Sequence, residues 1–132
     1  MDREELKKRL TSEEYHVTQE KGTETPFQNA YWDMQKEGTY ACKVCGQPLF
    51  YSNAKIDSSK GPLGLRGWPA FDEAIPGSVE YIRDRSLGMI RTEVVCSKCK
   101  AHLGHLFEDS ETKTCNHFCA NSASLSFKQK DK

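Results

Sequence analysis

The chain has 132 residues, which is enough for one domain with a single hydrophobic core. Its hydrophobic share of 36% is modest, so we expect a metal clip to add to the stability of that core. Nineteen basic and nineteen acidic side chains give a net charge of zero, whereas a nucleic-acid-binding protein normally carries a basic surplus. The composition therefore argues against nucleic acid as a partner.

The beginning of the sequence shows no apolar signal segment, and no run approaches transmembrane length. We expect no membrane partner and a cytoplasmic location, where thiols stay reduced. A monomer is the default expectation.

Residues 1–21 form the strongly helical part of the chain. Leu6 and Leu10 stand four positions apart on a charged segment and give one narrow apolar face. Thr11 and Glu14 have the spacing of a capping box that begins a second short helix. We expect a short, solvated helical arm over the main body, without a functional role of its own.

From Gly38 onward, short apolar runs separated by glycine and proline predict strands, and no run of ten residues carries a helical period. Mainly antiparallel β structure is the expected class, with 1–132 as a single domain. We expect a glycine-rich loop at 57–67 and a flexible tail at 128–132. The predicted strands are 40–42, 49–51, 79–82, 89–95, 103–107 and 124–127.

Two C-x-x-C pairs, Cys42 with Cys45 and Cys96 with Cys99, are separated by 50 residues. Two thiolates on such a turn can face one metal ion, and two turns complete a tetrahedral four-sulfur shell, which is typical of structural zinc. The sequence therefore predicts Zn²⁺ that fastens two distant hairpins. Two disulfides or a redox-active pair are the alternatives that spacing alone leaves open.

Two further cysteines, Cys115 and Cys119, lie near the C-terminus. An unpaired cysteine is usually a small buried hydrophobic residue without chemistry. The composition of the surrounding segment argues against that interpretation here.

Three of the four histidines, His102, His105 and His117, lie within sixteen residues of one another and close to Cys119 in sequence. Imidazole can lower the pKa of a thiol and supply a proton, and Asp109 is a candidate for orienting one of the rings. We expect a cysteine-centred active site. The alternatives are a second zinc site and histidines without chemistry.

Five motifs in order across residues 15–128 resemble the B-type methionine sulfoxide reductases. A set of five ordered motifs is far more specific than any single one. They are Gly22-Thr23-Glu24-Thr25-Pro26-Phe27, Gly67-Trp68-Pro69-Ala70-Phe71, Gly88-Met89-Ile90-Arg91-Thr92-Glu93-Val94, His102 to Asp109, and Cys119 to Phe127.

The resemblance implies a fold of two antiparallel sheets joined by structural zinc, and thiol-dependent reduction of the R epimer of methionine sulfoxide, free or in proteins. It implies a role in protein repair and the oxidative stress response, with thioredoxin or a similar small dithiol protein as reductant. Residue by residue, Cys119 matches the family's nucleophile and Trp68 the wall that packs the substrate methyl group. Phe118 matches an aromatic position beside the family's substrate pocket. The polar side of that pocket matches His102, His105, Asp109 and Asn121.

This assignment fits the chemistry of the residues. Cys119 would attack the sulfoxide sulfur while His105 protonates the departing oxygen. His102 would orient the site or a water molecule in it. The reaction leaves a sulfenic acid on Cys119. Trp68 would bury the methyl group, although a tryptophan is often an ordinary core residue.

The sequence departs from the family pattern in three places. Residues 57–67 are a longer loop without the resolving cysteine that many members carry there. Cys115 stands where glycine is usual and is a candidate resolving cysteine, with direct attack by an external thiol as the alternative. His117 occupies a position that is commonly arginine in the family. We expect it to take part in catalysis, and we expect activity to depend more steeply on pH than in a variant with arginine at this position.

Two other classes of protein use some of the same residues. A zinc-ribbon interaction module would need the four C-x-x-C cysteines and no chemistry at Cys119. A regulatory redox switch would use Cys115 and Cys119 without turnover.

Overall fold

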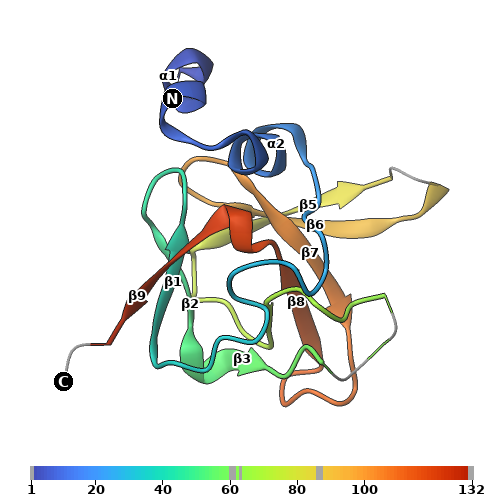
Figure 1. Ribbon diagram of the computed structural model, residues 1–132. Helices are drawn as coiled ribbons and strands as arrows, with labels where there is room; N and C mark the ends of the chain where they lie inside the picture. The colour runs from blue at the N-terminus through green and yellow to red at the C-terminus, as the bar shows by residue number, and fades with distance from the viewer. Residues whose placement is uncertain (1, 60–61, 63, 86–87, 131–132) are drawn as a thin grey trace.

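The computed structural model describes residues 2–59, 62, 64–85 and 88–130 of the chain. These residues form two antiparallel sheets with two helices at one end of the molecule (Figure 1). The mainly β class and the two-sheet architecture are as predicted. The smaller sheet has the order β2-β1-β9 and contains β1 (Gly38–Cys42), β2 (Pro48–Tyr51) and β9 (Leu125–Gln129).

The larger sheet has the order β3-β4-β8-β7-β6-β5, so its central strands come from the last third of the chain. The hairpin of β5 and β6 extends away from the body at one edge (Figure 1). The strands are β3 (Lys55–Ile56), β4 (Ala70–Phe71), β5 (Val79–Asp84), β6 (Arg91–Cys96), β7 (His102–Glu108) and β8 (Asn116–Ala120).

The core combines aliphatic side chains with a cluster of large aromatic rings. Phe50 stacks on Phe71 with ring centroids 4.2 Å apart, and Tyr40 meets Phe71 edge-on at 5.0 Å. All three are almost completely buried. Aromatic pairs contribute beyond their buried area, which helps a chain of modest hydrophobic content to hold one packed interior.

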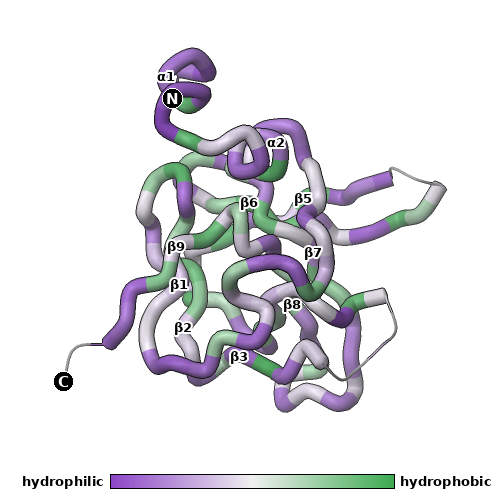
Figure 2. Tube along the Cα trace, viewed as in Figure 1, coloured by the Kyte–Doolittle hydropathy of each residue, from purple (hydrophilic) through white to green (hydrophobic). Residues whose placement is uncertain are grey.

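The helices are α1 (Arg3–Arg9) and α2 (Ser12–Glu20). The predicted capping box is present, since the Thr11 side chain accepts from the Glu14 N–H and the Glu14 carboxylate accepts from the Thr11 N–H. The expectation of a solvated arm is wrong in one respect. Although α1 is mainly hydrophilic (Figure 2), Leu6 belongs to the core and is 2% exposed. Burying such a side chain contributes about 1.5–3 kcal/mol.

Most predicted strands are present, but two boundaries need correction. Met89 and Ile90 precede β6, which begins at Arg91. The predicted flexible tail begins too early, because Lys128 and Gln129 pair with β1 in strand β9. The sequence did not predict β8, whose segment Asn116–Ala120 mixes polar and apolar residues. This missed strand lies in the middle of the larger sheet and carries Cys119.

Strands β7 and β8 approach each other closely at Gly104. A Cβ atom there would lie 1.9 Å from the main-chain oxygen of Cys119, so only glycine fits. The register of the β7–β8 pair places Gly104 opposite Ala120 and His105 opposite Cys119. Alternate residues of a strand face opposite sides, so Phe118 and Ala120 enter the core while Cys119 faces the other side of the sheet.

Candidate active site and metal centre

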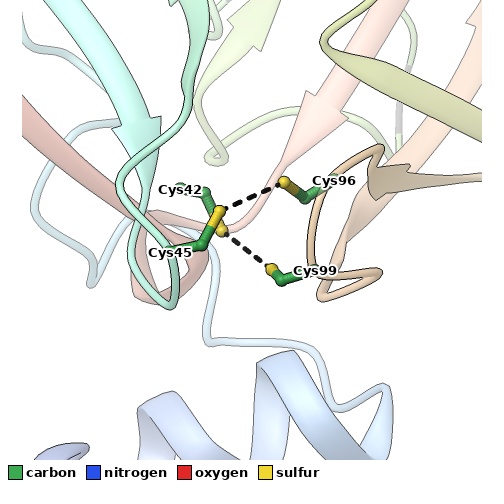
Figure 3. A group of neighbouring side chains, drawn as sticks. All are labelled: Cys42, Cys45, Cys96 and Cys99. Carbon is green, nitrogen blue, oxygen red and sulfur yellow. Dashed lines mark hydrogen bonds between the residues drawn. The ribbon is translucent and has the colours of Figure 1, made fainter. Parts of the chain in front are cut away.

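The sulfur atoms of Cys42, Cys45, Cys96 and Cys99 form one cluster in which all lie within 4.8 Å of one another. They come from two turns that face each other (Figure 3). The sulfurs of Cys42 and Cys99 are 3.5 Å apart, and those of Cys45 and Cys96 are 3.6 Å apart. These distances exceed the ~2.05 Å of a disulfide bond, and all six cysteines are free. The predicted pairing of the two C-x-x-C motifs across the fold is confirmed.

The local backbone explains why these turns gather sulfur. The N–H of Gly46 donates to the Cys42 carbonyl and that of Lys100 to the Cys96 carbonyl, each at 2.8 Å. Gly46 and Lys100 both have a positive φ, 83° and 65°, which tightens each turn just after its second cysteine. Four sulfurs around one ion at about 2.3 Å would be separated by about 3.8 Å, close to the spacing found. The cluster is therefore compatible with a structural metal site.

The crowding also perturbs the thiols. The hydrogen bond between Cys42 and Cys99 raises the pKa of Cys42 and lowers the pKa of Cys99 to about 5. Burial raises the pKa of Cys96. A bound cation would remove this competition for protons, since thiolates are the form that binds a metal.

Cys119 lines a small cavity of about 90 Å³ on the face of the larger sheet opposite the core. His105 from β7 and Asn121, directly after β8, share this cavity with Cys119, as does Trp68 from the segment before β4. Four of the residues predicted to form the active site are thus brought together. The remaining lining residues are Thr23, Gly64, Leu65, Arg91, Gly104, Phe107 and Ala120.

Trp68 is held by the main chain on both sides. Its indole Nε1–H donates to the Glu24 carbonyl at 2.9 Å. Gly67 has φ 95°, and a Cβ atom there would lie 2.7–2.8 Å from Phe27 and Pro26, so a glycine is needed just before the ring. The ring is therefore fixed as one wall of the cavity and is not a core tryptophan.

Glu24 organises the same wall. Its buried carboxylate accepts the N–H groups of Ser122 and Ala123, and its own N–H donates to Asn121 Oδ1 at 3.1 Å. Burial raises the pKa of this carboxyl group. Asn121 also donates to the Leu103 carbonyl, so both of its polar atoms are engaged. Asn121 supports the cavity through these bonds.

The histidines have separate carboxylate partners. His105 Nε2 lies 2.8 Å from Asp84 Oδ2, and His102 Nδ1 lies 2.8 Å from Glu93 Oε2. The two rings meet edge-on with centroids 5.5 Å apart. Burial lowers the pKa of His102. His102 is therefore a buried neighbour of His105 and does not line the cavity.

The expected activation of the thiol by imidazole needs correction. Burial raises the pKa of Cys119 to about 12, and the nearby Glu24 carboxylate adds to the effect. With His105 bonded to Asp84, the resting side chain of Cys119 is a neutral thiol at pH 7. Its proton must leave during the reaction.

His117 and Asp109 form a buried pair, with Nδ1 3.1 Å from Oδ2, and both line a different cavity. The bond to His117 lowers the pKa of Asp109. Neither residue lines the cavity of Cys119. Phe118 faces the core, where it contacts Phe50, and Phe107 is the aromatic residue of β7 that lines the cavity instead.

Cys115 lies at the other end of β8 from Cys119. It is exposed and has φ 64°, at the end of the turn that precedes the strand. Four residues of extended strand span about 13 Å, twice the Cα separation that a disulfide bridges. A direct bond between the two sulfurs would require the end of β8 to unpair.

The sequence alone gave no role to Asp84, Glu24 or Arg91. Glu24 and Arg91 do lie within the motifs that resemble the family. Asp84 lies opposite Arg91 in the β5–β6 hairpin and reaches His105 diagonally. No spacing rule in the sequence links it to His105, 21 residues away. In loop 57–67, Gly64 and Leu65 line the cavity, while Lys60, Gly61 and Leu63 lie outside the described residues.

Proteins of similar sequence show the family to which the chain belongs. The family described as "SelR domain" matches residues 10–129. The chain is 50% identical over 129 residues to mouse "Methionine-R-sulfoxide reductase B3, mitochondrial", which covers 97% of this chain and 49% of that protein. It is 46% identical over 129 residues to "Peptide methionine sulfoxide reductase MsrB" of Acinetobacter baumannii, covering 97% and 88%. A Synechococcus protein of the same name is 47% identical over 123 residues, covering 92% and 86%.

The chain therefore belongs to the SelR domain family, that of the B-type methionine sulfoxide reductases. It spans about half the length of the mouse relative. A crystal structure of the Mis18 "Yippee-like" domain is similar in fold alone, with a TM-score of 0.53 at 17% identity, covering 74% of this chain and all of that domain. In the part of the chain that the structure describes, no helix is long and apolar enough to cross a bilayer.

Proposed function

We propose that this protein reduces methionine sulfoxide, specifically its R epimer, to methionine at the expense of thiols, with Cys119 as the nucleophile. The observation that carries this proposal is the cavity in which the Cys119 thiol lies with an indole wall from Trp68 and a polar side from His105 and Asn121. A sulfoxide has a small apolar methyl group, a polarised oxygen and an electrophilic sulfur, and the cavity offers a surface for each.

The reaction transfers the oxygen atom to the enzyme. The Cys119 sulfur attacks the sulfoxide sulfur, the substrate's S–O bond breaks, and the products are methionine and Cys119 sulfenic acid. The cysteine sulfur is oxidised by two electrons and the methionine sulfur is reduced by two.

The proton follows the oxygen. Because burial keeps Cys119 as a thiol, the thiol proton itself is available for the sulfoxide oxygen as the sulfur attacks. His105, oriented by Asp84, lies opposite Cys119 across the two strands and can hold or pass this proton. His102, held by Glu93, supports the His105 ring from behind. His117, Asp109 and the core residue Phe118 lie outside the lining of the Cys119 cavity, so this proposal gives them no contact with the substrate.

Three contacts that do not move relative to one another can distinguish the two hands of the sulfoxide. With the methyl group against Trp68 and the rest of the methionine chain leading out of the cavity, the two epimers exchange the places of the oxygen and the lone pair on sulfur. Only one of them then directs its oxygen toward His105. This arrangement predicts a preference for one epimer, and the name of the mouse relative supports R as that epimer.

Regeneration consumes two thiols. The sulfenic acid and two external thiols give back the Cys119 thiol, a disulfide and water. Direct attack by a thioredoxin-like dithiol is favoured over Cys115, because β8 separates the two cysteines. Oxidised methionine in proteins or as the free amino acid is the proposed substrate, for a monomeric cytoplasmic protein that repairs oxidative damage.

The metal proposed for the four-cysteine cluster is zinc. Cys42, Cys45, Cys96 and Cys99 would hold it, and it would supply stability by joining the turn after β1 to the turn after β6. Its place in the fold is apart from Cys119, so the cluster is structural in this proposal.

Turnover of the separated epimers with dithiothreitol tests the function. We expect the R epimer of N-acetylmethionine sulfoxide amide to be reduced on the order of 100-fold faster than the S epimer. Turnover of the S epimer at an equal or greater rate would contradict the assigned epimer. A complete lack of turnover in the zinc-loaded protein would instead favour the interaction-module alternative.

A further inference from the structure

Glu93 is a fully buried carboxylate in the middle of strand β6, which lies next to the edge strand β5 of the larger sheet. It lies on β6 directly opposite His105 of β7 and is 1% exposed. A carboxylate taken out of water costs several kcal/mol unless charged or polar partners surround it. An apolar residue would therefore serve the packing of this strand better, which indicates that the carboxylate has a task.

One oxygen of Glu93 holds His102. Glu93 Oε2 lies 2.8 Å from Nδ1 of His102, a ring that is 4% exposed. Because burial lowers the pKa of His102, the ring is neutral and donates its Nδ1–H to the carboxylate. The same ring meets His105 edge-on at 5.5 Å, so Glu93 determines the surface against which His105 rests.

The other oxygen of Glu93 holds the end of helix α2. Lys21 Nζ lies 3.1 Å from Oε1, and Lys21 is the residue that caps α2, with φ 57°. The side chain of Lys21 is 64% exposed, so it covers Glu93 from the solvent side. The ion pair therefore ties the chain at residue 21 to strand β6 of the larger sheet.

The residues directly after Lys21 form one wall of the Cys119 cavity. We call residues 22–24 the pocket strap. Thr23 lines the cavity, and the Glu24 carbonyl accepts the Trp68 indole N–H. The far end of the strap is fixed by bonds of Glu24 to Ser122 and Ala123, and the near end by Lys21.

We propose that Glu93 is a positioning residue that aligns two walls of the Cys119 cavity, the pocket strap with Trp68 through Lys21 and the His105 side through His102. The kinetic part of this inference rests on the proposed function, because it needs turnover of sulfoxide. The groups with charge or titratable atoms that face Glu93 are Lys21 from the end of α2, His102 and His105 from β7, and Asp84 from β5 through His105.

Three variants separate the two routes by which Glu93 acts. We call the contact with Lys21 the strap arm and the contact with His102 the His102 arm. Lys21→Met removes only the ion pair and keeps a flexible chain of similar length. Glu93→Gln keeps an oxygen that can accept from His102 and removes the charge that attracts Lys21. Glu93→Leu removes both contacts. Glu20→Gln is the matched control, because it removes the charge of an exposed carboxylate on the same helix that contacts only His16 among the salt-bridge partners described.

We expect Lys21→Met and Glu93→Gln to raise KM for a small R sulfoxide about three- to tenfold with kcat within twofold of wild type, the pattern of loosened substrate binding. Glu93→Leu also lowers kcat by about tenfold or more, because the His105 side loses its support. Glu20→Gln leaves both constants at their wild-type values.

A second readout does not depend on activity. In ¹H–¹⁵N spectra we expect the Trp68 indole N–H to exchange with solvent at least several-fold faster in Lys21→Met and Glu93→Gln than in wild type and Glu20→Gln. The His102 Nδ1–H signal should persist in Glu93→Gln and vanish in Glu93→Leu.

Wild-type indole exchange and wild-type kinetics in Lys21→Met would overturn the strap arm. An unchanged His102 signal in Glu93→Leu would overturn the His102 arm. If wild type reduces no sulfoxide, the proposed function fails while the spectra still decide this inference.

Discussion

His105 lies directly opposite Cys119 on the neighbouring strands β7 and β8, and both side chains face the same cavity. The pairing depends on Gly104, since any side chain there would strike the main chain of Cys119. The thiol and the imidazole are therefore aligned by the sheet itself. Asp84 holds the ring from a third strand, so the geometry is rigid without a bond between the thiol and the imidazole.

Replacing Cys119 with serine should abolish reduction of the R sulfoxide, because a hydroxyl group cannot carry the oxygen as a sulfenic acid does. The loss should exceed about 1000-fold in kcat. Zinc content, measured by elemental analysis, should stay at the wild-type value because Cys119 lies outside the four-sulfur cluster. Normal turnover of the serine variant would show that another residue is the nucleophile.

Alkylation of Cys119 should be slow near neutral pH and accelerate with rising pH. Burial raises the pKa of this thiol to about 12, so the thiolate fraction increases about tenfold per pH unit between pH 8 and 11. Peptide mass spectrometry of the iodoacetamide adduct measures this rate. A plateau near pH 7 would mean that the resting enzyme carries a thiolate.

The burial of the Cys119 thiol also predicts that the folded protein loses stability as pH rises from about 9 toward 12. The thiol of the unfolded chain ionises first, at its ordinary pKa of 9.0, whereas the folded thiol resists ionisation up to about 12.

The Trp68→Phe variant should bind substrate more weakly. The smaller ring keeps an apolar wall but loses the indole hydrogen bond to the Glu24 carbonyl, so the ring can move away from the cavity. We expect KM for the small R sulfoxide to increase about five- to tenfold, for a lost hydrogen bond of about 1 kcal/mol or more. Trp32→Phe is the matched control, since Trp32 packs on Phe27 and does not line the Cys119 cavity. Equal effects of the two substitutions would remove Trp68 from the site.

Replacing Cys115 with serine should leave turnover with dithiothreitol within about twofold of wild type, because the extended strand β8 separates Cys115 from Cys119. Mass spectrometry after one turnover without reductant tests the same point. A lasting sulfenic acid on Cys119 and a free Cys115 are expected. An intramolecular disulfide would show that the end of β8 opens during the reaction.

Removing one zinc ligand with Cys96→Ser should unfold the protein or lower its melting temperature by more than 10 °C. Structural zinc contributes apparent binding free energies of about 10–16 kcal/mol, comparable to the whole stability of a domain. Calorimetry with and without chelator measures the change. Cys115→Ser is the control, because that exposed thiol lies outside the cluster. Wild-type stability in both variants would mean that no structural metal is bound.

Local sequence patterns determined much of this protein. The two C-x-x-C pairs predicted their own convergence, because each turn holds its two sulfurs within three residues, and the four do gather into one cluster. The capping box at Thr11 and the runs that became β1, β2 and β5 were also readable, since caps and β-rich apolar runs act over a few residues.

The strand that carries Cys119 was not readable. The segment Asn116–Ala120 does not alternate clearly between polar and apolar residues, because Cys119 faces the cavity and His117 is buried with Asp109. It became the central strand β8 through pairing with β7, which precedes it in the chain, and with β4, which is distant in sequence. The protonation of Cys119 was misjudged for the same reason, since burial under segments 22–24 and 64–68 outweighs the nearby histidines.

The amino-acid sequence by itself determined the class of fold and the four cysteines that gather into one cluster, because residue type and short-range spacing set both. It also predicted the cysteine, the histidine and the tryptophan that the structure brings into one cavity. Only the tertiary structure decided which groups meet. It paired His105 with Asp84 and His102 with Glu93, turned Phe118 into the core, and placed Cys115 a full strand away from Cys119. These relationships arise from sheet register and burial, which depend on the whole chain packing at once.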